Sequence, residues 1–255
     1  FLLMQNFAHG LIAVALLLFT LGCRQPTVQS DVITVAMPTA PNNLDPRYGT
    51  DDVSARAQQL MFNNLLTLDD HLNIAPGLGT SWETTDYQTY IVHLQQGVLF
   101  HDGHELTSKD VVYTFTSILD PNMASPYRGG YRELESVSAV DRYTVKFVAK
   151  HPSGAFLVGL VMKIVPDGAG RELSQHPVGT GPYRFFQYVV DDHLELRRFD
   201  RYYEGPARNG GIIMKVVPDD IMEGLELQKG GADLIVNDLA PDIVYQLERE
   251  GLHLE

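Results

Sequence analysis

A single cysteine, Cys23, sets the strongest limit on how this chain of 255 residues can fold. One thiol cannot form a disulfide within the chain, so a hydrophobic core must supply the stability of the folded part. The composition allows this, because 44% of the residues are hydrophobic. We therefore expect one large body, or two smaller ones, held together by packed apolar side chains.

The cysteine follows an apolar run, Leu11 to Leu21, that contains no charged residue. This run is shorter than the roughly 18 residues that indicate a membrane-spanning helix, and it is typical of a signal-peptide core. Its end, Thr20-Leu21-Gly22-Cys23, resembles a bacterial lipobox, in which the peptide is cut before the cysteine and the thiol is acylated. The alternatives are an ordinary signal peptide with an incidental cysteine and a tilted anchor helix.

We therefore predict three parts: a lipoprotein-type signal peptide over residues 1–22, the lipidated Cys23 with a polar tether over residues 23–30, and a folded body over residues 31–255. No Lys or Arg precedes the apolar run and the chain begins with Phe1, so we expect its natural start to lie upstream. The net charge of −13 lies entirely after residue 22. An acidic surface argues against nucleic acid as a partner, because phosphate binding needs clustered Lys and Arg.

Strand and helix patterns interleave along the body. Apolar and alternating runs predict strands at residues 31–37, 87–94, 98–100, 143–149, 183–188, 193–199, 212–217 and 233–236. Helical spacing predicts helices after Asp51 (reaching Leu65), after Thr107, around residues 221–225 and after Pro241. The run at 31–37 is nearly all apolar, which predicts burial on both faces. The interleaving indicates a mixed α/β class.

Patterns of catalytic and cofactor-binding residues are missing. His101-Asp102-Gly103-His104 is the densest histidine group, but it has no second pair of zinc ligands, and its Asp-Gly predicts a tight turn with exposed side chains. Gly179-Thr180-Gly181 has no following Lys-Ser or Lys-Thr, so it is not a P-loop. There is also no Gly-x-Ser-x-Gly elbow. We expect no enzyme activity, no catalytic residue, no cofactor and no metal site.

Four segments occur in the order found in a known family. They are Leu44-Asp45-Pro46, the stretch from Pro76 to Phe115 with Ser81-Trp82-Glu83 and Phe100-His101-Asp102-Gly103, Pro177 to Tyr183 followed by Arg198 to Tyr203, and Gly230 to Leu234. Together with the lipobox, they resemble the N-terminal portion of extracellular solute-binding proteins, family 5. These are the oligopeptide-, dipeptide- and nickel-binding proteins of ABC importers. The resemblance implies that Trp82 and Phe100 belong to the core, and that Gly179 to Tyr183 form a turn into a strand.

The resemblance implies a class II periplasmic-binding-protein-like fold, with mixed sheets, flanking helices and two lobes that close around a ligand. Family members are about twice as long as this chain, so we expect residues 31–255 to be an incomplete first lobe, with the second lobe missing. We expect residues 24–255 alone to bind peptides at least ~100-fold more weakly than a complete protein, a difference of about 2.7 kcal/mol.

The implied function is a lipid-anchored binding protein in the cell envelope. It captures peptides outside the cytoplasmic membrane and delivers them to ABC permease subunits. One alternative is the same scaffold binding nickel, haem or an oligosaccharide. Others are a secreted lipid-anchored hydrolase, for which no nucleophile–base pair is found, and a sensor or chaperone-like lipoprotein that kept the fold without transport.

By analogy, the loop after the first strand faces the ligand cleft, although an ordinary strand-ending turn would have the same sequence. The candidates on this loop are Met37, Pro38, Thr39 and Ala40. Tyr127 and Tyr131 are further candidates, because aromatic side chains often line such clefts.

Overall fold

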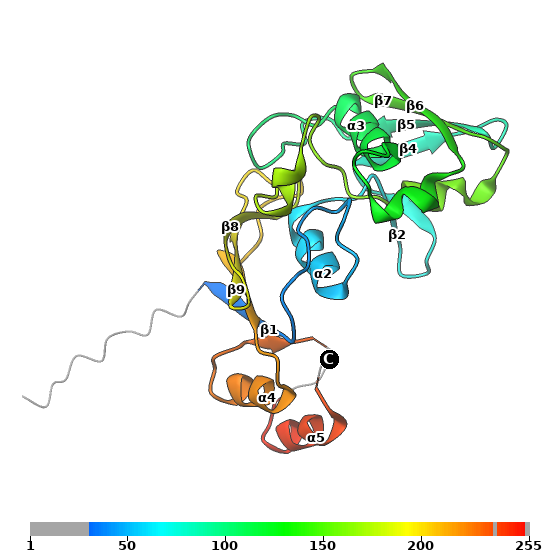
Figure 1. Ribbon diagram of the computed structural model, residues 1–255. Helices are drawn as coiled ribbons and strands as arrows, with labels where there is room; N and C mark the ends of the chain where they lie inside the picture. The colour runs from blue at the N-terminus through cyan, green and yellow to red at the C-terminus, as the bar shows by residue number, and fades with distance from the viewer. Residues whose placement is uncertain (1–30, 237–238, 253–255) are drawn as a thin grey trace, which may run out of the picture. The chain divides into compact units, whose positions relative to one another are not determined.

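The computed structural model describes residues 31–236 and 239–252 (Figure 1). These residues belong to the second of two units into which the chain divides, Phe1–Ser30 and Asp31–Glu255. The predicted signal peptide, Cys23 and the tether lie outside the described residues. None of the helices within the described ranges is both long and apolar enough to cross a membrane.

A five-stranded sheet joins the beginning of the body to residues far along the chain. Its order is β11-β1-β10-β9-β8, from the strands β11 (Leu234–Ile235), β1 (Val32–Met37), β10 (Gly211–Val216), β9 (His193–Arg198) and β8 (Tyr183–Val189). β1 is parallel to both β10 and β11, whereas β9 and β8 continue the sheet in antiparallel fashion. The five strands expected in these parts of the sequence are present, and their order depends on pairing between segments about 180 residues apart.

The burial of β1 differs from the prediction. Ile33 is 40% exposed, and only the last two residues of the strand are buried. Met37 joins one apolar cluster with Leu194 and Met214, and Ala36 joins a small one with Val217 and Ala232. These clusters reach only the end of the strand, so the prediction of burial on both faces along its whole length is wrong.

Helix α2 (Asp52–Met61) packs near β8 and follows the predicted acidic start. The Asp51 carboxylate accepts a hydrogen bond from the Ser54 backbone N–H at 2.8 Å, which satisfies one of the free donors of the first turn. The helix ends at Met61, so Leu65 is not on it as expected. Leu65 is instead buried in the core beneath the second large sheet, because the chain turns away after Phe62.

The second large sheet is antiparallel with the order β4-β5-β7-β6. Its strands are β4 (Gly79–Glu83), β5 (Thr89–Leu94), β7 (Thr144–Ala149) and β6 (Leu134–Asp141). Helix α3 (Ser108–Leu119) lies against β6 and β7 (Figure 1), and Asp110 accepts a hydrogen bond from the Thr107 N–H at 2.8 Å at its start. Phe100 is fully buried in this core and Trp82 is partly buried against it, as expected.

Shorter elements complete the described residues. A two-stranded sheet pairs β2 (Leu66–Leu68) with β3 (Ile74–Pro76), and 3-10 turns lie at η1 (Pro126–Tyr131), η2 (Gly154–Leu160) and η3 (Arg171–Ser174). The predicted strand at residues 98–100 is only an isolated bridge between Leu99 and Glu105. The last helices are α4 (Asp220–Gln228) and α5 (Pro241–Arg249).

The expected apolar face of α4 is largely uncovered, because Ile221 is 60% and Met222 48% exposed. Gly230 follows the helix with a φ of +71°, a conformation that glycine adopts without a steric penalty and that is common where helices end.

Candidate ligand-binding face

The two glycines of Gly179-Thr180-Gly181 let two backbone segments touch. A Cβ on Gly181 would lie 2.5 Å from the Met61 carbonyl carbon, and one on Gly179 would clash with the Met61 oxygen even more severely. The Gly181 N–H donates to the Met61 oxygen at 2.9 Å. These glycines therefore join the end of α2 to the start of β8.

His101 fastens the same segment to the second sheet. Its Nδ1 accepts from the Gly179 N–H at 3.2 Å, so its Nε2 carries the hydrogen and donates to the Gly181 carbonyl at 3.0 Å. Burial lowers the pKa of His101 to about 4, which keeps the ring neutral near pH 7. The expectation of exposed histidines at this turn is wrong for His101, because both of its ring nitrogens bond to the backbone of Gly179 and Gly181. We call these two hydrogen bonds the His101 clip. His104 remains at the surface, where it bonds to Asp102 at 2.6 Å.

A candidate ligand-binding face lies at one edge of the five-stranded sheet. β1, β10 and β11 are parallel, so their carboxyl ends, at Met37, Val216 and Ile235, lie on the same edge. Ligands of open α/β sheets bind outside the carboxyl ends of the strands. The loop that leaves β1 at this edge, residues 38–50, is therefore well placed for ligand contact.

The four residues predicted at the end of β1 and the start of this loop differ in exposure. Met37 is only 2% exposed and its side chain packs in the core, while its carbonyl accepts from the Val217 N–H at 2.8 Å. Pro38 and Ala40 are half-buried, and Thr39 is exposed. Of these side chains, that of Thr39 is the most accessible to a ligand.

A network of polar contacts holds the next part of the loop against α2. The Asn43 N–H donates to Ser54 Oγ at 3.1 Å, and Gln58 Nε2 donates to the Asn43 carbonyl at 3.0 Å. Asp51 accepts from Ser54, as described above, and from the Asn42 N–H at 3.4 Å. Burial raises the pKa of Asp51, but the hydrogen bonds from Ser54 and Asn42 outweigh burial and lower it overall. Asp51 is thus held ionised, and α2 presents the loop as a fixed structure.

Tyr127 lies beside this loop. The Ser125 hydroxyl donates to the Arg47 carbonyl at 2.7 Å, the Tyr48 hydroxyl donates to the Met123 carbonyl at 2.7 Å, and the Tyr127 hydroxyl donates to the Gly49 carbonyl. Tyr127 is still 36% exposed. The structure therefore brings Tyr127 to the candidate loop.

Tyr131 belongs to a different environment. Its ring meets Phe115 edge-on with a centroid separation of 5.4 Å, and burial raises the pKa of its hydroxyl to about 12. It packs against the core of the second sheet, whereas Met37 packs in the core of the first. Within residues 31–236 and 239–252, Tyr131 makes no hydrogen bond and no ring contact with loop 38–50.

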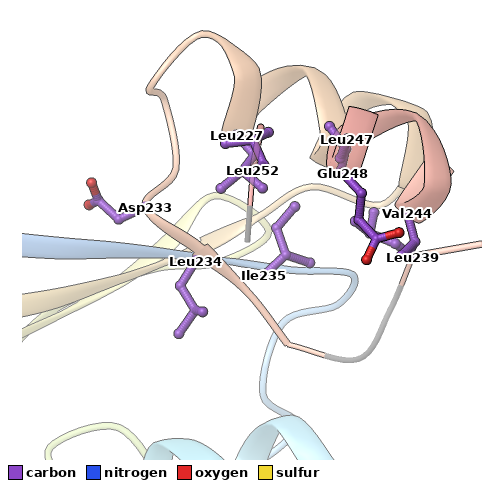
Figure 2. Close-up of a pocket in the computed structure, with 9 residues that line it drawn as sticks. All are labelled: Leu227, Asp233, Leu234, Ile235, Leu239, Val244, Leu247, Glu248 and Leu252. Carbon is purple, nitrogen blue, oxygen red and sulfur yellow. The ribbon is translucent and has the colours of Figure 1, made fainter. Parts of the chain in front are cut away.

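An apolar pocket of about 250 Å³ lies between β11, α4 and α5 (Figure 2). Leu227, Ile235, Val244 and Leu247 contribute to its walls, and none of the predicted ligand residues does. The Asp233 carboxylate points away from these leucines in Figure 2 and accepts from the Thr34 N–H at 2.7 Å. This lining offers few polar groups to orient a ligand, and the pocket is best understood as a gap in helix packing.

Within the described ranges, no group of three or more His, Cys, Asp or Glu side chains is arranged so that it could hold a metal ion.

Comparison with known proteins identifies the chain. Residues 73–254 match the model of the bacterial extracellular solute-binding proteins, family 5 (middle region). The chain belongs to this family. The oligopeptide-binding protein AppA of Bacillus subtilis is 30% identical over 211 residues, which cover 77% of this chain and 38% of AppA. The dipeptide-binding protein of Escherichia coli is 26% identical over 262 residues, covering 89% of this chain and 49% of the relative.

Solved structures of the solute-binding family share the fold. AppA in complex with a nonapeptide superposes with a TM-score of 0.75 at 28% identity, covering 78% of this chain and 42% of AppA. DppA of Helicobacter pylori with the peptide STSA superposes with a TM-score of 0.79 at 27% identity, covering 86% of this chain and 48% of DppA. NikZ of Campylobacter jejuni, bound to Ni(L-His), superposes with a TM-score of 0.80 at 23% identity, covering 88% of this chain and 46% of NikZ. At this level of identity the likeness shows the fold alone. The predicted α/β fold of the periplasmic-binding-protein type is confirmed.

This member of the solute-binding family spans about half the length of the curated relatives that it matches, or less.

Sequence reasoning missed a buried ion pair at the base of the loop. Arg47 is 1% exposed and Asp45 is fully buried, and their side chains meet at 2.7 Å. Arg47 also donates to Ser117 Oγ at 3.2 Å and to the Ala169 carbonyl at 3.0 Å. Burial alone would lower the pKa of Arg47, but the hydrogen bonds and charge of Asp45 outweigh burial and raise it. The only sequence signal was Leu44-Asp45-Pro46, which carried the family resemblance without indicating this role.

Proposed function

We propose that this chain is the substrate-binding component of an ABC importer that captures peptides outside the cytoplasmic membrane. The observation that carries the proposal is its family membership, combined with relatives whose structures hold peptides, AppA with a nonapeptide and DppA with STSA. Because the chain spans about half of such relatives, the proposal concerns the share of the binding site that this part contributes.

The loop after β1 has the backbone groups that peptide capture needs. In the part of the chain that the structure describes, the N–H groups of Thr39 and Ala40 make no hydrogen bond. They follow a strand, and an extended peptide can pair its backbone with such groups, which gives affinity with little dependence on the peptide's side chains. Tyr127, exposed next to the loop, offers an aromatic surface for a side chain of the ligand. Pro38 to Ala40, the Met37 backbone and Tyr127 are the proposed ligand contacts at this loop. Tyr131 remains a proposed contact away from the loop, because it packs against the core of the second sheet.

The proposed cellular role follows from the N-terminus. Residues 1–22 would direct export, and an acylated Cys23 would hold the body on the outer side of the membrane through the tether over residues 23–30. The partners are the peptide, the permease subunits and the membrane. The role is binding and delivery, without chemical turnover and without a cofactor.

The test is an NMR titration of the chain, carrying Cys23→Ala to keep it unacylated, with trialanine and pentaalanine. We expect the backbone amide signals of Thr39 and Ala40 to shift. Ala40→Pro removes one N–H donor and should weaken peptide binding at least about 10-fold, the loss expected when a hydrogen bond of roughly 1.5 kcal/mol is removed. Ala40→Gly keeps the N–H group and serves as the matched control, with affinity close to that of the parent.

The same titration separates the ligand classes. Shifts at residues 38–40 caused by Ni(L-His), haem or an oligosaccharide, and not by peptides, would replace the peptide by one of those ligands. Peptide-induced shifts confined to other parts of the chain would refute the assignment of the loop. No response to any of these ligands would refute the proposed binding role of this chain.

A further inference from the structure

A second cavity, of about 580 Å³, lies where η1 meets the end of the β6–β7 pair. Three cationic side chains line it, from Arg128, Arg132 and Lys150, and so do Leu119, Tyr131 and Leu134. Of the proposed ligand contacts, Tyr131 lines it, but residues 37–40 and Tyr127 do not, so it is separate from the candidate ligand-binding loop.

The fold brings these three cations together from two parts of the sequence. Arg128 lies in η1, and Arg132 follows immediately as the residue that ends this turn. Lys150 comes directly after β7, where Ala149 pairs with Leu134 of β6. The Lys150 N–H donates to the Glu133 carbonyl at 2.9 Å, which holds Lys150 beside the residue that follows Arg132.

None of the three cations has a partner within residues 31–236 and 239–252. Among the described residues, the side chains of Arg128, Arg132 and Lys150 make no hydrogen bond and no ion pair. Other cations of this chain do find carboxylates, as in Arg142 with Glu105 and Lys215 with Glu226, both at 2.8 Å. Cations without an ion pair also occur elsewhere among the described residues, but here three of them line one cavity in a protein of net charge −13.

No Asp or Glu of the described part of the chain lines the cavity, and the nearby Glu133 lines a neighbouring pocket with Ser153 and Phe156. Like charges gathered in a concave site repel one another, and a bound anion would remove this repulsion. Arginine forks bind the oxygens of a phosphate in pairs, and a lysine adds a point charge. The partly buried Tyr131 and Leu119 with the buried Leu134 form an apolar wall suited to the carbon part of an ester.

We propose that this cavity binds a phosphate group carried by a small organic ester, supplied either by a free phosphate ester or by a phospholipid headgroup. This proposal does not depend on the peptide-binding role. The two sources share their chemistry and differ in whether the phosphate is dissolved or lies at a bilayer surface.

The experiment uses the whole chain with Cys23→Ala, so that no acyl chain attaches it to vesicles. Calorimetry with glycerol 1-phosphate at low ionic strength measures the free source. Sedimentation with phosphatidylglycerol vesicles, and with neutral phosphatidylcholine vesicles for comparison, measures the lipid source. The triple variant Arg128→Gln, Arg132→Gln, Lys150→Gln should weaken binding to at least one of these phosphates about 10-fold or more, because it removes all the charge-assisted contacts.

A matched control carries Lys109→Gln, Arg208→Gln and Lys229→Gln, three exposed cations outside the cavity that likewise have no ion pair among the described residues. It changes the net charge equally and should stay within about 2-fold of the parent, since screened charges at a distance contribute little. Equal losses in the two triple variants would overturn the proposal in favour of a general charge effect. Absence of binding to both phosphates, or equal binding of acetate, would also overturn it.

Discussion

The Asp45–Arg47 pair gives the sharpest test of how this fold holds its candidate face. Asp45→Asn removes the carboxylate charge while keeping the shape of the side chain. Arg47, which is 1% exposed, would then carry a buried positive charge without its ion-pair partner. Breaking a buried pair in this way costs about 3–5 kcal/mol, compared with a total stability of about 5–15 kcal/mol for a typical domain. We expect the free energy of unfolding to fall by that amount.

Urea unfolding followed by the fluorescence of the only tryptophan, Trp82, measures the loss, because this side chain packs against the core of the second sheet. With an m value of about 2 kcal/mol per M, the midpoint should fall by about 2 M. The matched control is Asp52→Asn, which removes the carboxylate of the exposed pair with Arg56 on one helix and should cost only about 0.3–0.5 kcal/mol. A loss below about 1 kcal/mol for Asp45→Asn, similar to that of the control, would refute the reasoning.

Three more predictions address the other contacts that join the parts of the body and its anchor. Gly181→Ala should lower the free energy of unfolding by about 1–3 kcal/mol in the same urea assay, because the new Cβ would collide with the Met61 backbone. Gly154→Ala is the control and should be neutral, because a Cβ at Gly154 has open space around it. Equal losses in the two variants would contradict this account. His101 has a pKa of about 4 in the folded state and an ordinary value near 6.5, so the unfolded chain takes up a proton first as the pH falls. The contribution of His101 to the free energy of unfolding should be complete above pH 6.5 and should decline by about 2–4 kcal/mol as the pH falls to 4. The decline is measured as the difference in the free energy of unfolding between the parent and His101→Gln at each pH. A difference that does not change with pH would count against the clip. Cys23→Ala should abolish acylation and release the protein from membranes in a fractionation assay, and full retention would argue against the lipid anchor.

Local structure could be predicted well because its causes lie within a few residues. Thr107 and Asp110 are three residues apart, so their hydrogen bond at the start of α3 depends only on the geometry of one helical turn. The same holds for Asp51 with Ser54 and for Gly230 at the end of α4. The wrong helix end at Leu65 has a different cause. The helical periodicity of the sequence continues through Leu65, but the chain turns after Phe62, and Leu65 packs in the core of the second sheet.

The candidate loop could be placed after the first strand from the family resemblance, but its surroundings could not. Tyr127 reaches Gly49 across 78 positions of sequence, and Arg47 reaches Ala169 across 122. No local pattern distinguishes a tyrosine that lies beside the loop from one, such as Tyr131, that packs against Phe115.

The sequence alone was sufficient for the class of fold, the family, most strands and helices, and the expectation of a lipid-modified Cys23. The strand order with β1 between β10 and β11, the clip made by His101 and the buried charge of Arg47 all required the folded chain. The physical reason is that backbone geometry and apolar periodicity act between near neighbours, whereas the burial and pairing of a polar group depend on which distant segments the fold brings beside it. Arg47 shows this most clearly, because an arginine in a loop is expected in water until Asp45, Ser117 and Ala169 are seen around it.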